Sequence, residues 1–152
     1  MRIEKLCPTT ENIATVATWL WDEWGTKEPN NYNFWYSWVE SSNCDNEIPQ
    51  TFVCIEGKEM IGTVSLWRCD LQSRQDIYPW LGGLYVKKEQ RGKGFAKALM
   101  EYACVIARKM DYNSLYLFTE LNGFFEDIGW KYLEEIPDEY GKMVKLYKKG
   151  LI

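Results

Sequence analysis

The stretch VKKEQRGKGFAKALM, residues 86–100, decides how the rest of the chain is interpreted. Between positions 87 and 97 it sets five basic residues against one acid, although the whole chain carries a net charge of −4. Two glycines, Gly92 and Gly94, interrupt this run, and an apolar-periodic segment follows directly. The start of a helix has unpaired backbone N–H groups and a partial positive charge, so it receives anions well. The stretch therefore predicts an anion-binding loop at the beginning of a helix.

Three kinds of phosphate loop were compared with this stretch. A Walker A loop needs Lys and Ser or Thr directly after its last glycine, but Gly94 is followed by Phe-Ala-Lys-Ala. A dinucleotide fingerprint, G-x-G-x-x-G, fails because Lys97 stands at the third glycine. The pattern R-x-x-G-x-G/A is satisfied at every fixed position by RGKGFA, residues 91–96. The alternative to a phosphate loop is that residues 87–97 form a solvated loop and helix start that bind no ligand.

The hydrophobic pattern on either side of the loop predicts alternating strands and helices. Paired glycines, Gly82-Gly83, favour a bulge or a close backbone approach inside one strand. Strands are expected at 1–6, at 50–71 as a hairpin turning at 56–58, and at 78–88, 114–120, 131–136 and 142–149; helices are expected at 9–25, from 34 to 41–43, at 94–110 and at 122–128.

This order predicts an α/β fold with a mixed, mostly antiparallel sheet and helices on both faces. Strand 78–88, helix 94–110 and strand 114–120 form a central parallel βαβ unit, because parallel neighbours need a crossover connection. The 152 residues are expected to form one domain, 1–152. No apolar run approaches the ~20 residues of a membrane helix, and the start of the chain has no apolar segment of the kind found in signal peptides. We therefore expect a cytoplasmic protein without a membrane partner.

Composition excludes several classes of chemistry. The chain has no histidine, which removes Ser-His-Asp and Cys-His nucleophilic sites and histidine-ligated zinc or haem. Its five cysteines include no CxxC pair, so free thiols and no metal site are expected. The acidic balance argues against nucleic acid as a partner. Any general base must then be a carboxylate, a tyrosine, a lysine or a water relay.

With these observations in place, the chain resembles the GNAT superfamily of acyl-CoA-dependent N-acetyltransferases, in particular a subgroup of small bacterial acetyltransferases. The resemblance rests on LYV (84–86) followed by the loop at 91–96, on NGFFEDIGW (122–130), and on the order of elements along nearly the whole chain. It implies a GNAT-type fold. It also implies transfer of an acetyl group from acetyl-CoA to a primary amine, by direct attack in a ternary complex.

The resemblance also implies which residues hold acetyl-CoA, the cosubstrate. Backbone N–H groups of the loop would bind its pyrophosphate, the strand before the loop would pair with its pantetheine arm, and an asparagine after strand 114–120 could reach that arm. The implied residues are Leu84, Tyr85, Val86, Arg91, Gly92, Lys93, Gly94, Phe95, Ala96, Lys97 and Asn122.

One position departs from the family pattern. Many members carry a tyrosine in the segment after strand 114–120 that protonates the leaving thiolate, and here that position is Phe125. Another group or a water could donate the proton, or the thiolate could leave unassisted. A second hypothesis follows, in which the chain is a weak or inactive acyl-CoA-binding module. A third, a protein-interaction domain, is suggested by five tryptophans within the first two predicted helices.

The amine must lose a proton before it attacks, because an alkyl ammonium has a pKa near ~10.4. Carboxylates expected near the acceptor are Glu23, Asp70 and Asp76, with Tyr140 as a further polar candidate. Of these, Glu23, Asp76 and Tyr140 are taken as the predicted catalytic residues. The acceptor stays open between a polyamine, an aminoglycoside, an amino acid and a protein N-terminus, and the chain between a monomer and a homodimer.

Overall fold

The computed structural model describes residues 1–28 and 30–152, and the order of elements agrees with the sequence pattern except for the helix predicted at 122–128. Within these residues it contains β1 (Arg2–Lys5), α1 (Thr10–Trp24), α2 (Asn31–Glu40), β2 (Gln50–Glu56), β3 (Glu59–Trp67), β4 (Trp80–Val86), the 3-10 helix η1 (Lys88–Gln90), α3 (Phe95–Lys109), β5 (Ser114–Thr119), the 3-10 helix η2 (Glu126–Ile128), β6 (Lys131–Pro137) and β7 (Met143–Gly150).

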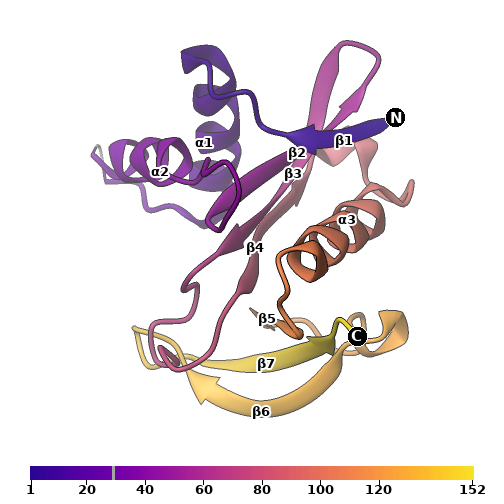
Figure 1. The fold of residues 1–152 in the computed structure, drawn as a ribbon. Helices are drawn as coiled ribbons and strands as arrows, with labels where there is room; N and C mark the ends of the chain where they lie inside the picture. Colours follow the sequence, from indigo (N-terminus) through magenta and orange to yellow (C-terminus); the bar gives the residue numbers. More distant parts are fainter. Residues whose placement is uncertain (29) are drawn as a thin grey trace.

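The strands form one sheet in the order β1-β2-β3-β4-β5-β7-β6. Among the described strands, β4 and β5 alone are parallel neighbours, and α3 connects them. Helices α1 and α2 cover one face of the sheet and α3 covers the other (Figure 1). The predicted fold class, a mostly antiparallel sheet with a central parallel βαβ unit and helices on both faces, is confirmed.

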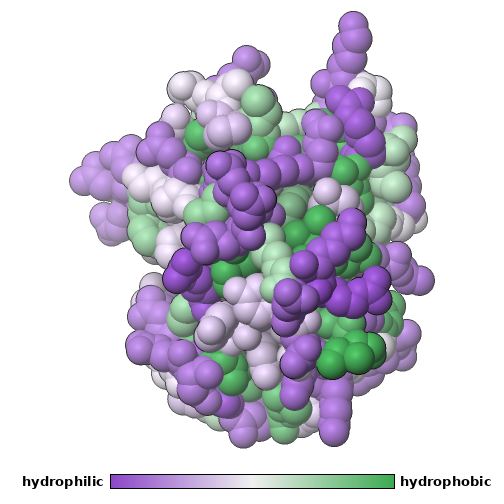
Figure 2. All heavy atoms as spheres, viewed as in Figure 1, coloured by the Kyte–Doolittle hydropathy of each residue, from purple (hydrophilic) through white to green (hydrophobic). Residues whose placement is uncertain are grey.

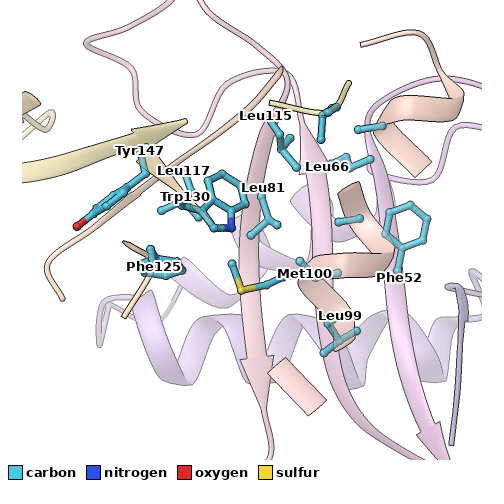
Figure 3. Packing of buried hydrophobic residues seen from close by; sticks show 14 of the residues in the cluster. Phe52, Leu66, Leu81, Leu99, Met100, Leu115, Leu117, Phe125, Trp130 and Tyr147 are labelled. Atoms are coloured by element: carbon cyan, nitrogen blue, oxygen red, sulfur yellow. The ribbon is translucent and has the colours of Figure 1, made fainter. Parts of the chain in front are cut away.

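Local sequence explains where α1 begins and ends and which side of α3 is buried. The hydroxyl of Thr9 accepts a hydrogen bond from the backbone N–H of Asn12 at 3.1 Å and caps α1, which ends before Gly25. In α3, one side of the helix is buried against the sheet through Leu99, Met100, Ala103 and Ala107. Figure 3 shows Leu99 and Met100 packed among strand residues such as Leu66 and Leu81.

The predicted helix at 122–128 is wrong. The chain forms only the three-residue η2 there, between two glycines with left-handed backbone angles, φ +80° at Gly123 and +92° at Gly129. A left-handed residue cannot continue an α-helix, so these glycines confine the helical turn. Burial of Phe125 and Trp130 in the main core holds the segment in place. A smaller difference is that α2 begins at Asn31, three residues before the predicted start at 34.

Polar and charged residues cover most of the face drawn in Figure 2, with apolar residues visible between α3 and the strands and near the C-terminus. Among the described residues, no helix is both long and apolar enough to cross a bilayer.

Candidate functional site

The candidate site lies where β4 and β5 separate. The two strands pair at a single position, Trp80 opposite Tyr116, supported by a 3.1 Å hydrogen bond from Tyr116 N–H to the Pro79 carbonyl. Beyond Trp80, the edge of β4 that faces β5 has no strand partner in the described sheet. An extended ligand can therefore add to this edge as a strand would.

A β-bulge at Gly83 and Leu84 accompanies the separation. Thr63 of β3 lies opposite Tyr85 and Ser65 lies opposite Gly82, so two residues of β4 face one residue of β3. Gly83 has φ +60°, a conformation that glycine adopts without strain. The bulge expected at the glycine pair is present.

The glycine pair also makes room for the Trp67 indole. A Cβ atom at residue 82 would overlap the Trp67 ring, and one at residue 83 would lie 2.9 Å from its Cη2 atom. The glycine pair therefore has two effects: it permits the β-bulge, and it makes room for the Trp67 ring. The indole fixes β4 from the α1–α2 side of the sheet.

The loop after β4 presents free backbone donors. Among the described residues, none of the N–H groups of residues 92–97 has a hydrogen-bond acceptor. Gly92 and Gly94 have φ +78° and +88°, and a Cβ at either would meet open space. Because α3 begins at Phe95, these amides surround the positive end of its helix dipole. Such an arrangement suits a diphosphate.

The basic side chains of the loop act differently from the backbone. Arg91 Nε donates to the Val86 carbonyl at 2.8 Å, and its guanidinium lies 5.5 Å from the Tyr85 ring centroid. Lys93 donates to the Gln90 side chain at 3.2 Å, and Lys97 lies 4.0 Å from Glu101. Arg91 thus ties the loop back to the end of β4, which is a structural role.

A cavity of about 200 Å³ opens beside these amides. Its lining runs from Val86 through the loop to Lys97 and includes the ring of Phe124, which is 44% exposed. Asn122 is exposed two residues before Phe124 and is not part of the lining. In the sequence, Phe124 is only one residue of the family pattern NGFFEDIGW, so its place in this cavity was not predicted.

The side chains of the β4 residues proposed for the cofactor are anchored away from the open edge. The Tyr85 ring stacks on Trp19 of α1 with centroids 5.4 Å apart, and Leu84 packs against the main core. This anchoring leaves the backbone of the strand as the group available to a ligand.

Asp70, in the loop between β3 and β4, reaches the opposite side of the bulge. A Cβ at residue 82 would lie 2.9 Å from its Oδ2 atom, so the carboxylate sits against Gly82 and beside the Trp67 ring. Burial, together with the negative charge of Glu139, raises the pKa of Asp70 to about 7. The sequence indicated Asp70 only as one of three carboxylates; its position close after a strand was the available signal.

The three predicted catalytic residues lie in more exposed positions. Glu23 is exposed on the last turn of α1, and Tyr140 is 83% exposed in the turn between β6 and β7. Asp76 receives two hydrogen bonds from Arg74, at 2.8 and 2.9 Å, and this guanidinium lowers the pKa of Asp76. A carboxylate held in this way is a weak proton acceptor at neutral pH. Asp70 is the carboxylate whose oxygen lies against Gly82.

Phe125, at the position of the expected tyrosine, is only 7% exposed. Figure 3 shows it grouped with Trp130 and Tyr147 at one end of the core cluster. Tyr147 donates its hydroxyl to the Glu126 carboxylate, and this bond raises the pKa of Tyr147 to about 12.

Comparisons with known proteins agree with this geometry. Residues 13–130 match the Acetyltransferase (GNAT) family. Among curated proteins, none matches the sequence. An aminoglycoside 6'-N-acetyltransferase solved as a complex with coenzyme A has a TM-score of 0.76 and 14% identity, covering 100% of this chain and 98% of its own.

Two further structures are similar over nearly their full length. An aminoglycoside 6'-N-acetyltransferase from Enterococcus faecium has a TM-score of 0.75 and 14% identity, covering 100% of this chain and 98% of its own. A spermidine N-acetyltransferase from Vibrio cholerae has a TM-score of 0.73 and 15% identity, with coverage of 99% and 95%. At these identities the likeness concerns the fold. The sequence match, which spans most of the chain and includes both the bulge and the loop, shows that the protein belongs to the GNAT acetyltransferase family.

Proposed function

We propose that this protein transfers an acetyl group from acetyl-CoA to a primary amine by direct attack in a ternary complex. The observation that carries the proposal is the continuous binding path formed by the open edge of β4 and the unpaired amides of residues 92–97. An acyl-CoA has the matching sequence of groups: an amide-bearing pantetheine arm followed by a diphosphate. The solved relative that holds coenzyme A has the same fold.

The residues of the path have separate tasks. The backbone of Leu84, Tyr85 and Val86 pairs with the pantetheine arm, and the amides of 92–97 bind the pyrophosphate, with Lys93 and Lys97 adding positive charge. This positions the thioester carbonyl at the bulge, next to Gly82. Catalysis then depends mainly on placing the amine and the thioester together and on polarising the carbonyl.

A direct assay tests the proposal. Wild-type protein is mixed with acetyl-CoA and a panel of primary amines, and free thiol is followed against time. We expect amine-dependent release of CoA thiol, with acetylated amine formed in equal amount. Acetyl-CoA at about 100 times its Kd adds about 2.7 kcal/mol to stability, which raises Tm by about 5–10 °C. Absence of amine-dependent thiol release would contradict the proposal, and absence of a rise in Tm as well would also remove acetyl-CoA binding.

A second candidate function is an acyl-CoA-binding module without turnover, and Phe125 is the observation that favours it. It predicts the same rise in Tm with no thiol release above buffer. A protein-interaction surface built from tryptophans is less well supported, because Trp24 alone of the eight tryptophans is classed as exposed in the described structure.

A further inference from the structure

The proton that the acceptor amine must lose has a candidate destination in Asp70. Within residues 1–28 and 30–152, no hydrogen-bond donor or cation contacts the Asp70 carboxylate, although the side chain is partly buried and lies against Gly82. A carboxylate that is partly removed from water is usually paired, because the loss of hydration is costly. Its Oδ2 atom lies against Gly82, next to the bulge where the proposed function places the thioester.

An aromatic row leads from the surface to this carboxylate. The Phe34 ring, 51% exposed on α2, lies 5.5 Å from Trp38, and Trp38 lies 5.3 Å from Trp67. Trp67 is 5% exposed, and its indole N–H has no acceptor in the described structure. Rings of this kind attract ammonium groups and pack against apolar bodies.

A second carboxylate gives this end of the gap a negative potential. Glu139, in the turn between β6 and β7, acts on Asp70 electrostatically. Figure 1 shows this turn at the same end of the molecule as the loop between β3 and β4, and Arg74 of that loop bonds Glu134 of β6 at 3.1 Å. A cation is therefore favoured at this place and a carboxylate-bearing ligand is disfavoured.

We propose that Asp70 is the general base of the reaction and that the row Phe34, Trp38 and Trp67 receives a primary amine with an apolar body and no carboxylate. This inference rests on the proposed function and adds the class of acceptor and the residue that takes its proton.

The proton and electron balance is complete without another reactant. Asp70 takes one proton from the substrate ammonium, and the freed nitrogen lone pair forms a bond to the thioester carbonyl carbon. The carbon–sulfur bond then breaks, and its electron pair leaves with sulfur. The second proton of the nitrogen passes to the thiolate, giving amide and CoA thiol, and Asp70 releases its proton to water.

The groups around Asp70 set the pH at which it accepts a proton. Glu139 faces it from the β6–β7 turn, Cys69 adjoins it on its own loop, and the rings of Trp67 and Trp38 carry no charge. Burial and Glu139 both act against ionisation, so the pKa lies near about 7 rather than at the ordinary value of 3.8. A base is most effective when its pKa lies near the working pH.

The test compares Asp70→Asn with wild type and with Asp45→Asn, an exposed carboxylate paired with Lys5. The acceptor is 2-phenylethylamine, and kcat/KM is measured from pH 5.5 to 10. Wild type and Asp45→Asn should rise about tenfold per pH unit up to about pH 7 and then level. Asp70→Asn should be about 10²–10³-fold slower at pH 7.5 and rise without levelling toward the pKa of the amine itself.

Specificity is tested with a matched pair of acceptors. Phenylalanine is 2-phenylethylamine with one added carboxylate, and wild type should use it at least about tenfold less well. Equal kcat/KM for the two compounds would overturn the assignment of acceptor class. A wild-type pH profile and kcat in Asp70→Asn would overturn the assignment of the base.

Failure of the inference and failure of the proposed function are distinguishable. If wild type binds acetyl-CoA but turns over no amine, the transferase proposal is wrong. Tryptophan fluorescence then reports binding of 2-phenylethylamine to the acetyl-CoA complex. Binding weakened about tenfold or more in Asp70→Asn, with the Kd for acetyl-CoA unchanged, supports the acceptor site, and equal binding overturns it.

Discussion

The two sides of the gap between β4 and β5 are built by different means. On the cofactor side, the binding groups are backbone amides of consecutive residues, 92–97, exposed by glycines in left-handed conformations. On the proposed acceptor side, Asp70, Trp38 and Glu139 come from three separate parts of the chain, and their side chains form the site. A backbone site can be recognised from a short motif, whereas a side-chain site depends on the finished fold.

Gly82 belongs to both sides, and its substitution should have the largest effect. We expect Gly82→Ala to lower the free energy of unfolding by about 2–3 kcal/mol, because the new methyl group overlaps the Trp67 ring. Gly150→Ala is the matched control: it also lies in a strand, but its Cβ meets nothing within 4 Å. Urea unfolding measures both variants, and equal midpoints would contradict the packing described for the bulge.

The cofactor side is tested alone by Gly94→Ala. Its Cβ would stand in the open space before the amides, and we expect acetyl-CoA affinity to fall about thirtyfold, or ~2 kcal/mol. Gly57→Ala, in the turn between β2 and β3, has the same left-handed strain, φ +63°, and the same open surroundings. Calorimetric titration should therefore separate two variants of similar stability. Equal loss of affinity in both would show that strain, and not the amide site, is responsible.

The acceptor side is tested alone by the stability of Asp70→Asn against pH. The folded-state pKa of about 7 lies above the ordinary 3.8, so the folded protein binds more protons between these values and loses stability as pH rises from about 4 to about 7. Asn removes this loss. We expect Asp70→Asn to be about 1–2 kcal/mol more stable than wild type at pH 8, a Tm increase of about 3–6 °C.

At pH 4 the same two proteins should melt within about 1 °C of each other, because Asp70 is then protonated in wild type as well. The matched control, Asp45→Asn, should show no such divergence. A Tm difference that is independent of pH would contradict the raised pKa.

The smallest effect is expected from Phe125→Tyr, which restores the hydroxyl of the family pattern. The ring is buried with Trp130 and Tyr147, so the added group enters an apolar cluster. We expect a stability loss of about 1 kcal/mol and a kcat change below about twofold. Phe124→Tyr, whose ring is 44% exposed, should keep wild-type stability. A tenfold gain in kcat with Phe125→Tyr would show that the position faces the leaving thiolate after all.

Most of the fold could be predicted from the sequence because its signals are local. Thr9 and Gly25 delimit α1, the glycine loop precedes α3, and the parallel pairing of β4 with β5 follows from the helix that connects them. The helix predicted at 122–128 is shorter in the structure because Gly123, inside that range, adopts a left-handed angle that the apolar pattern does not reveal.

The candidate site likewise has a part that local sequence predicts and a part that depends on the fold. The loop at 91–96 and the bulge were expected from consecutive residues, and the structure has free amides and a register shift there. The sequence could not show whether Asp70 or Asp76 is the better candidate base, because the two carboxylates differ in the neighbours that the fold brings to them. Arg74 pairs with Asp76, whereas Glu139 and the Trp67 ring surround Asp70.

The contact between Trp67 and the glycine pair has an evolutionary consequence. Because the indole fills the volume that side chains at 82 and 83 would need, neither partner changes favourably without the other. A smaller residue at 67 alone leaves a void, and a larger residue at 82 alone collides with the ring. We therefore expect these positions to show strong epistasis, so that descendants of this sequence retain the tryptophan and the glycines together or replace them together.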